Sequence, residues 1–214
     1  MLPAFAQEDS QGVIEGPAGQ LEVMTTWTDS EHACVAIICH PHPLHHGSMH
    51  NKVVSTIAKA CDQMGMPTVR FNFRGVGKSE GVHDYAVGEQ DDLRAVIAWV
   101  KQALPGYDIC LAGFSFGAFI SASVAQDIRP RLLMSIAPAV NHADFTTLHN
   151  MPLPWLVVHG DSDDVVPCAP VKAWVECSAL GMDFEVMEGA GHFFHGRLIE
   201  LRALLFDWLK CNLL

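Results

Sequence analysis

The chain has 214 residues, of which 50% are hydrophobic and 17% are charged, and its formal net charge is −11. This composition is typical of a globular protein with a substantial core and excludes a disordered chain. The excess of acidic residues argues against a nucleic acid or an anionic membrane as a partner, because both attract basic surfaces.

The first 11 residues are expected to be flexible, and residues 12–214 are expected to form a single domain. Residues 12–15 and 20–25 alternate as a short hairpin would, around a Gly-Pro-Ala-Gly turn at 16–19. From residue 33 onward, apolar runs of strand length alternate with segments of helical periodicity. The predicted strands are 34–39, 66–71, 109–112, 131–137, 155–159 and 182–187, and the predicted helices are 51–64, 88–103, 116–126, 169–180 and 196–210.

This alternation predicts an α/β fold, with a mostly parallel, twisted sheet and helices on both faces. Four loops follow predicted strands and contain polar or glycine-rich sequence, at residues 40–50, 113–117, 160–167 and 188–195. Folds of this class place their chemistry at the carboxyl ends of the strands. We therefore expect these four loops to meet at one edge of the sheet.

The motif Gly-Phe-Ser-Phe-Gly at residues 113–117 lies between a predicted strand and a predicted helix. A sharp strand-to-helix turn brings the backbone of both flanks close together, so a Cβ at Gly113 or Gly117 would clash. Such a turn holds the central Ser115 at its tip with the hydroxyl exposed. A serine hydroxyl is a weak nucleophile unless a base takes its proton, so a histidine and a carboxylate are expected further along the chain.

A second motif, Gly77-Lys78-Ser79, matches the end of a phosphate-binding loop. That loop requires a glycine five residues before Gly77, where this chain has Asn72, and no predicted helix follows directly. Phosphate binding at this position is therefore not expected.

Cysteine usage and the amino terminus bear on localisation. None of the seven cysteines forms a Cys-x-x-Cys pair, and most lie inside apolar patterns, as expected of reduced, mostly buried thiols in a cytoplasmic protein. Residues 1–7 lack a basic start and a long apolar region, so no signal peptide is expected. No apolar run approaches the length of a membrane span.

Over residues 12–210 the chain resembles the α/β-hydrolases. The resemblance rests on the 113–117 turn, the His-Pro-His-Pro loop at 40–43, and the segments 73–79, 159–167 and 189–192. Within that superfamily it looks most similar to small, lidless bacterial serine hydrolases related to the dienelactone hydrolases. True dienelactone hydrolases use a cysteine nucleophile, whereas this chain has Ser115, so the resemblance does not extend to a lactone substrate.

The resemblance implies a catalytic triad in the chain order serine, aspartate, histidine. Ser115 would be the nucleophile. The family's acid is the fourth residue of Gly-x-x-Asp, which is Asp163 in this chain, while the neighbouring Asp161 and Asp164 would serve in the turn.

His192, which follows Gly189-Ala-Gly, would be the general base. His195 is its rival three residues later, and His159 is interpreted as a structural histidine at a strand end.

An oxyanion hole needs two backbone N–H donors. One is expected from Phe116 and the other from the 40–44 loop. Pro41 and Pro43 have no N–H, so the second donor is either His42 or Leu44. The family's His-Gly-x pattern, with Pro41 at the glycine position, points to His42.

Five histidines between residues 40 and 50 raise the alternative of a metal site: His40, His42, His45, His46 and His50. Zinc sites usually add thiols or carboxylates at wider or helical spacing, and the prolines hinder chelation by neighbouring residues. We therefore expect no functional metal and no cofactor, while adventitious binding of nickel or zinc by this cluster stays open.

The predicted activity is hydrolysis of small to medium carboxylic esters through an acyl-enzyme, since the 138–153 connection is too short for a large lid. The partner would be a small-molecule ester or thioester. Two alternatives remain open, a thioesterase and a non-catalytic binding module on the same fold. The sequence does not predict the oligomeric state.

Overall fold

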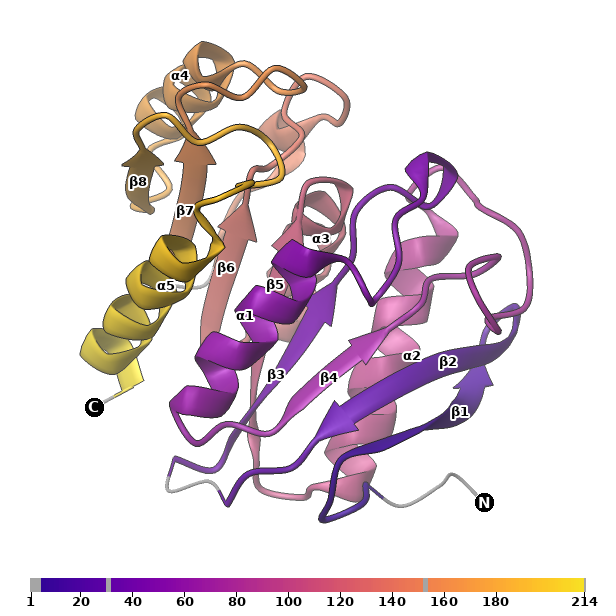
Figure 1. Ribbon diagram of the computed structural model, residues 1–214. Coiled ribbons are helices and arrows are strands. Elements are labelled where there is room, and N and C mark those ends of the chain that lie inside the picture. The colour runs from indigo at the N-terminus through magenta and orange to yellow at the C-terminus, as the bar shows by residue number, and fades with distance from the viewer. Residues whose placement is uncertain (1–4, 30–31, 152–153, 214) are drawn as a thin grey trace.

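The computed structural model describes residues 5–29, 32–151 and 154–213, which form one eight-stranded sheet in the order β1-β2-β4-β3-β5-β6-β7-β8 (Figure 1). β1 and β2 form an antiparallel hairpin, β2 pairs antiparallel with β4, and the other strands run parallel. The strands are β1 (Ser10–Gly16), β2 (Gly19–Thr26), β3 (Cys34–Cys39), β4 (Thr68–Phe71), β5 (Asp108–Phe114), β6 (Leu132–Ile136), β7 (Trp155–Gly160) and β8 (Asp183–Met187).

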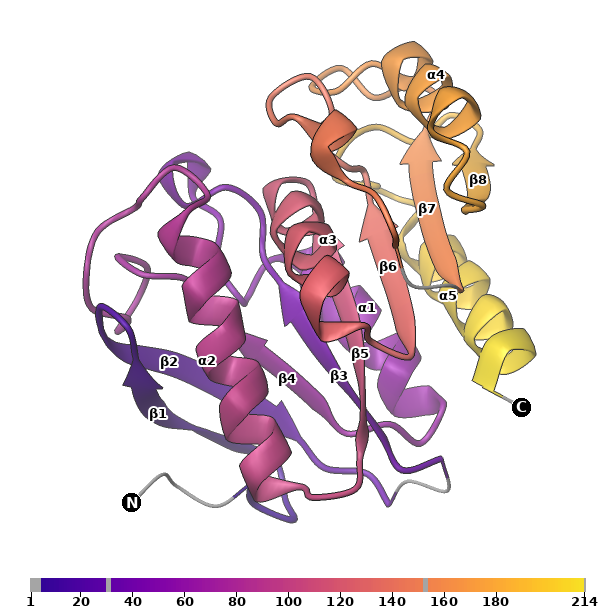
Figure 2. The same cartoon turned by 180° about the vertical axis from the view of Figure 1, so that it is seen from behind.

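Five α-helices cover the two faces of the sheet. They are α1 (Lys52–Gln63), α2 (Gly88–Ala103), α3 (Phe116–Ile128), α4 (Cys168–Ser178) and α5 (Leu198–Leu213). α1 and α5 lie side by side on the face turned to the viewer in Figure 1, and α2 and α3 cover the opposite face in Figure 2. The predicted α/β class, with a mostly parallel sheet and helices on both faces, is confirmed.

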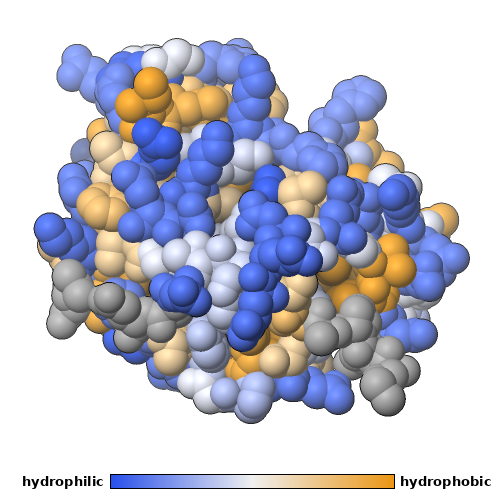
Figure 3. All heavy atoms as spheres, turned by 60° about the horizontal axis from the view of Figure 1, so that its bottom comes forward, coloured by the Kyte–Doolittle hydropathy of each residue, from blue (hydrophilic) through white to orange (hydrophobic). Residues whose placement is uncertain are grey.

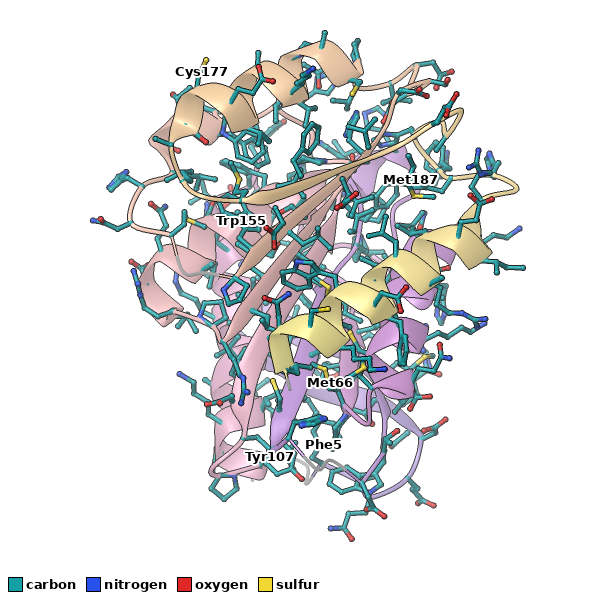
Figure 4. The ribbon with its side chains drawn as sticks, turned by 90° about the vertical axis from the view of Figure 1, so that its left-hand side faces the viewer. Phe5, Met66, Tyr107, Trp155, Cys177 and Met187 are labelled. Atoms are coloured by element: carbon teal, nitrogen blue, oxygen red, sulfur yellow. The ribbon has the colours of Figure 1, made fainter. Side chains whose placement is uncertain are left out.

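Strands β3, β5, β6 and β7 form the centre of two hydrophobic cores, one on each face. Every residue of β3 is buried, as a strand covered on both sides requires. Alternate residues point to opposite faces, so Val35 and Ile37 join the core under α2 and α3, whereas Ala36 and Ile38 join the core under α1 and α5. Figure 4 shows Trp155 and Met187 on opposite sides of the sheet, and each belongs to a different core.

The amino-terminal hairpin begins earlier than the alternation predicts. β1 starts at Ser10, inside the segment expected to be flexible, and Phe5 is buried against Trp27 and Trp99. Residues 1–4 of that segment lie outside the described residues. The division into a flexible start and one domain over 12–214 stays a prediction.

The connection between β6 and β7 is less polar than the sequence suggested. It contains a short 3₁₀ helix, η2 (Phe145–Thr147), and buries Phe145, Leu148 and Met151. The ring of Phe145 packs against Phe119 of α3 and Trp174 of α4. The segment is thus an anchored part of the core. Within the described residues, no large cap domain lies over the sheet.

The surface near the amino ends of the strands is mainly hydrophilic, with small separate apolar areas (Figure 3). Among the described residues, no helix combines the length and the apolar character that crossing a bilayer requires. The loops that follow the parallel strands lie at the other edge of the sheet, where they line one pocket.

A buried ion pair ties α2 to the loop after β4. The side chain of Asp92 is fully buried and accepts hydrogen bonds from the Arg74 guanidinium at 2.7–3.1 Å and from the Arg74 amide at 3.0 Å. These contacts raise the pKa of Arg74, with the hydrogen bond to Asp92 as the largest cause. The pair fixes the start of the 74–87 segment, which forms one wall of the site described below.

We predict that Asp92→Asn lowers the free energy of unfolding by about 3 kcal/mol, because the largely buried Arg74 charge then keeps only the carboxylate of Asp84, 3.8 Å away. The matched control is Asp91→Asn on the same helix. Asp91 pairs with Arg94 in an exposed ion pair at 3.2 Å, and its loss should change stability by at most about 1 kcal/mol. Urea denaturation of both variants measures the difference, and equal effects would contradict it.

Candidate active site

Loops from six parts of the chain surround a pocket of about 750 Å³ at the carboxyl ends of the parallel strands. Four of them are the loops predicted to converge, and they contribute residues 41–46, 115–116, 165 and 192–193. The other two walls, residues 83–86 and 139–143, were not predicted to belong to the site. Ser115 and His192 both line this pocket.

The turn between β5 and α3 has the geometry that the motif predicts. Ser115 adopts φ 56° and ψ −114°, a conformation that costs about 1–3 kcal/mol for a residue with a side chain. A Cβ on Gly113 would lie 2.1 Å from the Gly117 carbonyl oxygen, and a Cβ on Gly117 would lie 2.4 Å from that of Cys39. Both positions therefore require glycine, because the atoms that a Cβ would meet belong to the backbone and cannot move aside.

Ser115 is joined to two residues far along the chain by a series of hydrogen bonds. Its Oγ lies 3.1 Å from Nε2 of His192, and Nδ1 of His192 lies 2.7 Å from Oδ2 of Asp163. All three residues are more than 90% buried, with Ser115 8% exposed, Asp163 7% and His192 4%. The structure therefore brings together the three side chains that the sequence proposed as a triad.

The Asp163 carboxylate is stabilised in its charged form. Burial alone would raise its pKa, but the hydrogen bond from His192 and the backbone amides of Val165 and Val166, which donate to Oδ1, lower it below the usual value. An ionised Asp163 fixes Nδ1 of His192 as the protonated nitrogen. Nε2 then faces Ser115 as a hydrogen-bond acceptor.

His159 lies behind this carboxylate and is fully buried. Its Nε2 lies 2.8 Å from the Val166 carbonyl, so this nitrogen carries the proton, and it is 3.4 Å from Oδ2 of Asp163. Burial lowers the pKa of His159, which favours the neutral ring. The contacts agree with the structural role predicted for it, and they add a contact with Asp163 that the sequence did not suggest.

The rival residues have other partners. Asp161 accepts a hydrogen bond from the Gly189 amide, which ties the loop after β7 to the loop after β8, and another from the neighbouring Ser162 hydroxyl. Asp164 is exposed, and the exposed ring of His195 stacks on Phe193. His192 is the member of its loop that reaches Ser115, and Asp163 is the member of its loop that reaches His192.

The two amides proposed for an oxyanion hole lie beside the same pocket, because both His42 and Phe116 line it and their rings are 4.9 Å apart. The amide of Leu44 donates to Nδ1 of His42 at 3.2 Å, so the alternative donor is already engaged. In the described part of the chain, the amides of His42 and Phe116 have no acceptor. Both remain available for a ligand.

The histidine that begins this loop holds it in place. Nε2 of the fully buried His40 accepts the amide of Phe73 at 3.0 Å, and its Nδ1 lies 2.6 Å from the Pro41 carbonyl. Burial lowers the pKa of His40 to about 4, so the ring is neutral at physiological pH. Over the described residues, no group of three or more histidine, cysteine or acidic side chains is arranged to hold a metal ion.

The wall formed by residues 83–86 is fixed by Glu89, whose side chain is fully buried. Its two carboxylate oxygens accept the amides of Asp84 and Ala86 at 2.8 and 2.9 Å. Tyr85 and Ala86 both have positive φ, 49° and 74°, which this carboxylate stabilises. Sequence reasoning placed Glu89 only near a helix start, and no motif marked it as a residue that shapes the pocket.

The segment that resembles a phosphate-binding loop has a different set of contacts. The amide of Lys78 donates to the buried Glu22 carboxylate at 2.9 Å, and the Ser79 hydroxyl donates to the Asn72 carbonyl at 2.7 Å. An internal carboxylate thus occupies the position of an external anion. The Gly77–Ser79 motif serves to join this loop to β2.

Comparison with known proteins agrees with this architecture. Residues 37–137 match the family model described as the α/β hydrolase fold. An α/β serine hydrolase homologue from Coxiella burnetii, whose structure has been solved, is 54% identical over 96% of this chain and 100% of its own, with a TM-score of 0.93.

Two further comparisons extend the similarity. An α/β serine hydrolase without a lid from Xanthomonas campestris is 41% identical over 97% of this chain and 96% of its own, with a TM-score of 0.94. An uncharacterized protein of Rickettsia prowazekii is 36% identical over 92% of this chain and 87% of its own.

We predict that Gly117→Ala lowers the free energy of unfolding by about 1–3 kcal/mol or more, because the new methyl group meets the Cys39 and His40 carbonyls at 2.4 and 2.5 Å. The matched control is Gly12→Ala in β1, where nothing lies within 4 Å of the added Cβ. That change should be neutral or stabilising by up to about 1 kcal/mol. Thermal and urea unfolding measure both, and a Gly117→Ala protein as stable as the control would refute the steric argument.

Proposed function

The chain belongs to the α/β-hydrolase family as a small serine hydrolase without a lid, and on this premise we propose that it hydrolyses small to medium carboxylic esters through an acyl-enzyme. The observation that supports the proposal most directly is the hydrogen-bonded series from Ser115 through His192 to Asp163 at the wall of a 750 Å³ pocket. Hydroxyl, imidazole and carboxylate in this order can activate a serine for attack on an acyl carbon.

In the first half-reaction, the Ser115 oxygen attacks the ester carbonyl while Nε2 of His192 takes its proton. Asp163 stabilises the imidazolium that forms and keeps its proton-bearing Nδ1 in place. His192 then donates the proton to the leaving oxygen, and the acyl group remains on Ser115. In the second half-reaction, water attacks the acyl carbon while His192 again takes the proton. The bond from that carbon to the Ser115 oxygen then breaks, His192 returns the proton to this oxygen, and the acid is released.

The tetrahedral intermediate places a negative charge on the former carbonyl oxygen. The amides of His42 and Phe116 are proposed to donate to this oxygen. Phe116 is the first residue of α3, so the partial positive charge at the amino end of the helix favours the same anion. His40 supports this role indirectly, because it fixes the loop that carries His42.

The proposed preference for small to medium substrates rests on the open edge of the sheet. Within the described residues, no cap domain covers the pocket, and the segment between β6 and β7 packs on α3 and α4 instead. A long acyl chain would extend into water. Since the proposed chemistry does not distinguish an alcohol from a thiol leaving group, thioesters are included in the test.

We predict that Ser115→Ala folds normally and loses at least about 10³-fold in turnover of p-nitrophenyl esters. Ser123→Ala, on the outer part of the same helix α3, is the matched control and should keep the activity of the original protein. Steady-state rates for acyl chains of rising length, compared with acyl-CoA thioesters, identify the preferred substrate. Activity that survives in Ser115→Ala would exclude this mechanism, and thioesters turned over far faster than esters would replace the ester assignment by the thioesterase.

A further inference from the structure

The pocket concentrates histidines and lacks other charged side chains. Six of the 12 histidines in the chain line it, although the chain as a whole carries a net charge of −11. Among the described residues that line the pocket, none is aspartate, glutamate, lysine or arginine. The six histidines are His42, His45, His46, His83, His142 and His192.

The proposed mechanism uses the side chain of only one of these six histidines. His192 is the base, and His42 contributes its backbone amide. His45, His46 and His142 are exposed and come from two separate loops. Among the described residues their rings take part in no hydrogen bond, and the ring of His45 lies against that of His42. They are free to bind a group that enters the pocket.

His42 and His83 form the inner part of the cluster. The ring of His42 lies 4.8 Å from that of His83 and 5.0 Å from that of His45, where the loops of residues 40–46 and 81–87 lie side by side (Figure 1). Because Nδ1 of His42 accepts the Leu44 amide, the neutral ring carries its proton on Nε2 and is a donor there. Burial lowers the pKa of His42, and the neighbouring His83 and His45 lower it further.

We propose that this histidine cluster binds a carboxylate carried by the substrate, so that the preferred ester has a negatively charged acyl or alcohol part. This inference rests on the proposed function. Imidazole N–H groups donate to a carboxylate when neutral and add a positive charge when protonated. The acidic remainder of the surface repels such a substrate, while the pocket has no lining carboxylate to do so.

Protonation of the cluster gives the site a defined pH dependence. Three acidic side chains lie beside the histidine cluster. Oε1 of Glu89 lies 2.8 Å from Nδ1 of His83, and Asp163 pairs with His192. Asp84 lies on the 83–86 wall, and its side chain is 55% exposed. Tyr85 is the remaining titratable group of the pocket. An anion binds the protonated cluster more tightly, so its affinity rises as the pH falls from 8 to 6.

His192 must be neutral to act as the base, so its protonation lowers the rate for charged and neutral esters alike. A ratio of two substrates removes this effect, because both depend equally on His192. The first pair is 4-acetoxybenzoate and its neutral isostere 4-acetoxybenzamide, which differ in the alcohol part. The second pair is monoethyl adipate and ethyl adipamate, which differ in the acyl part.

We expect the ratio of kcat/KM, charged over neutral, to rise at least about fivefold from pH 8 to pH 6 in one of the two pairs. This value corresponds to a single protonation in the cluster that strengthens binding of the anion about tenfold. The double variant His45→Gln/His46→Gln should reduce the rise, whereas His149→Gln, an exposed histidine outside the pocket, should keep it. Ratios that stay within twofold in both pairs would overturn the inference.

Calorimetry separates this inference from the proposed function and needs no variant. Binding of 4-hydroxybenzoate to the original protein should strengthen about fivefold from pH 8 to pH 6, and binding of 4-hydroxybenzamide should not. If the neutral esters are hydrolysed but neither 4-hydroxybenzoate nor either substrate pair shows such a dependence, the carboxylate site is wrong and the esterase stands. If no ester is hydrolysed but 4-hydroxybenzoate binds as described, the site stands and the esterase is wrong.

Discussion

The close approach of three backbone segments around Ser115 is the constraint on which the site depends. Gly117 lies so near the carbonyls of Cys39 and His40 that no side chain fits between them. This approach places the start of α3 against the end of β3, and it brings the amide of Phe116 and the loop of His42 to the same pocket. The positive φ of Ser115 follows from the same turn and directs its hydroxyl away from the sheet.

The carboxylate of Asp163 provides the second fixed point. It is buried, yet the amides of Val165 and Val166 and the ring of His192 supply enough donors to keep it charged. His159 lies behind it and binds the Val166 carbonyl, so the loop that carries the acid is held from both sides. Asp163 and His192 are 29 residues apart in sequence, and their hydrogen bond keeps Nε2 of His192 facing Ser115.

Much of this could be predicted from the sequence, because its signals are local. Apolar runs of strand length and the 113–117 motif indicated the strands, the turn and the loops that meet at the sheet edge. The 83–86 wall was not predicted, since its shape depends on Glu89, a carboxylate that looks like an ordinary acid in the first turn of α2.

Asp92 was missed for the same reason, because its partner Arg74 lies in another loop. The burial of Phe145, the first residue of η2, likewise depends on a tertiary contact, with Trp174.

The most direct measurement of the central claim is the intact mass of the protein after reaction with a fluorophosphonate at neutral pH. The triad predicts a single adduct that peptide mapping assigns to Ser115 and that forms far more slowly in His192→Ala; a folded protein that gains no adduct, or gains it at another residue, would contradict the claim that Ser115 is an activated nucleophile.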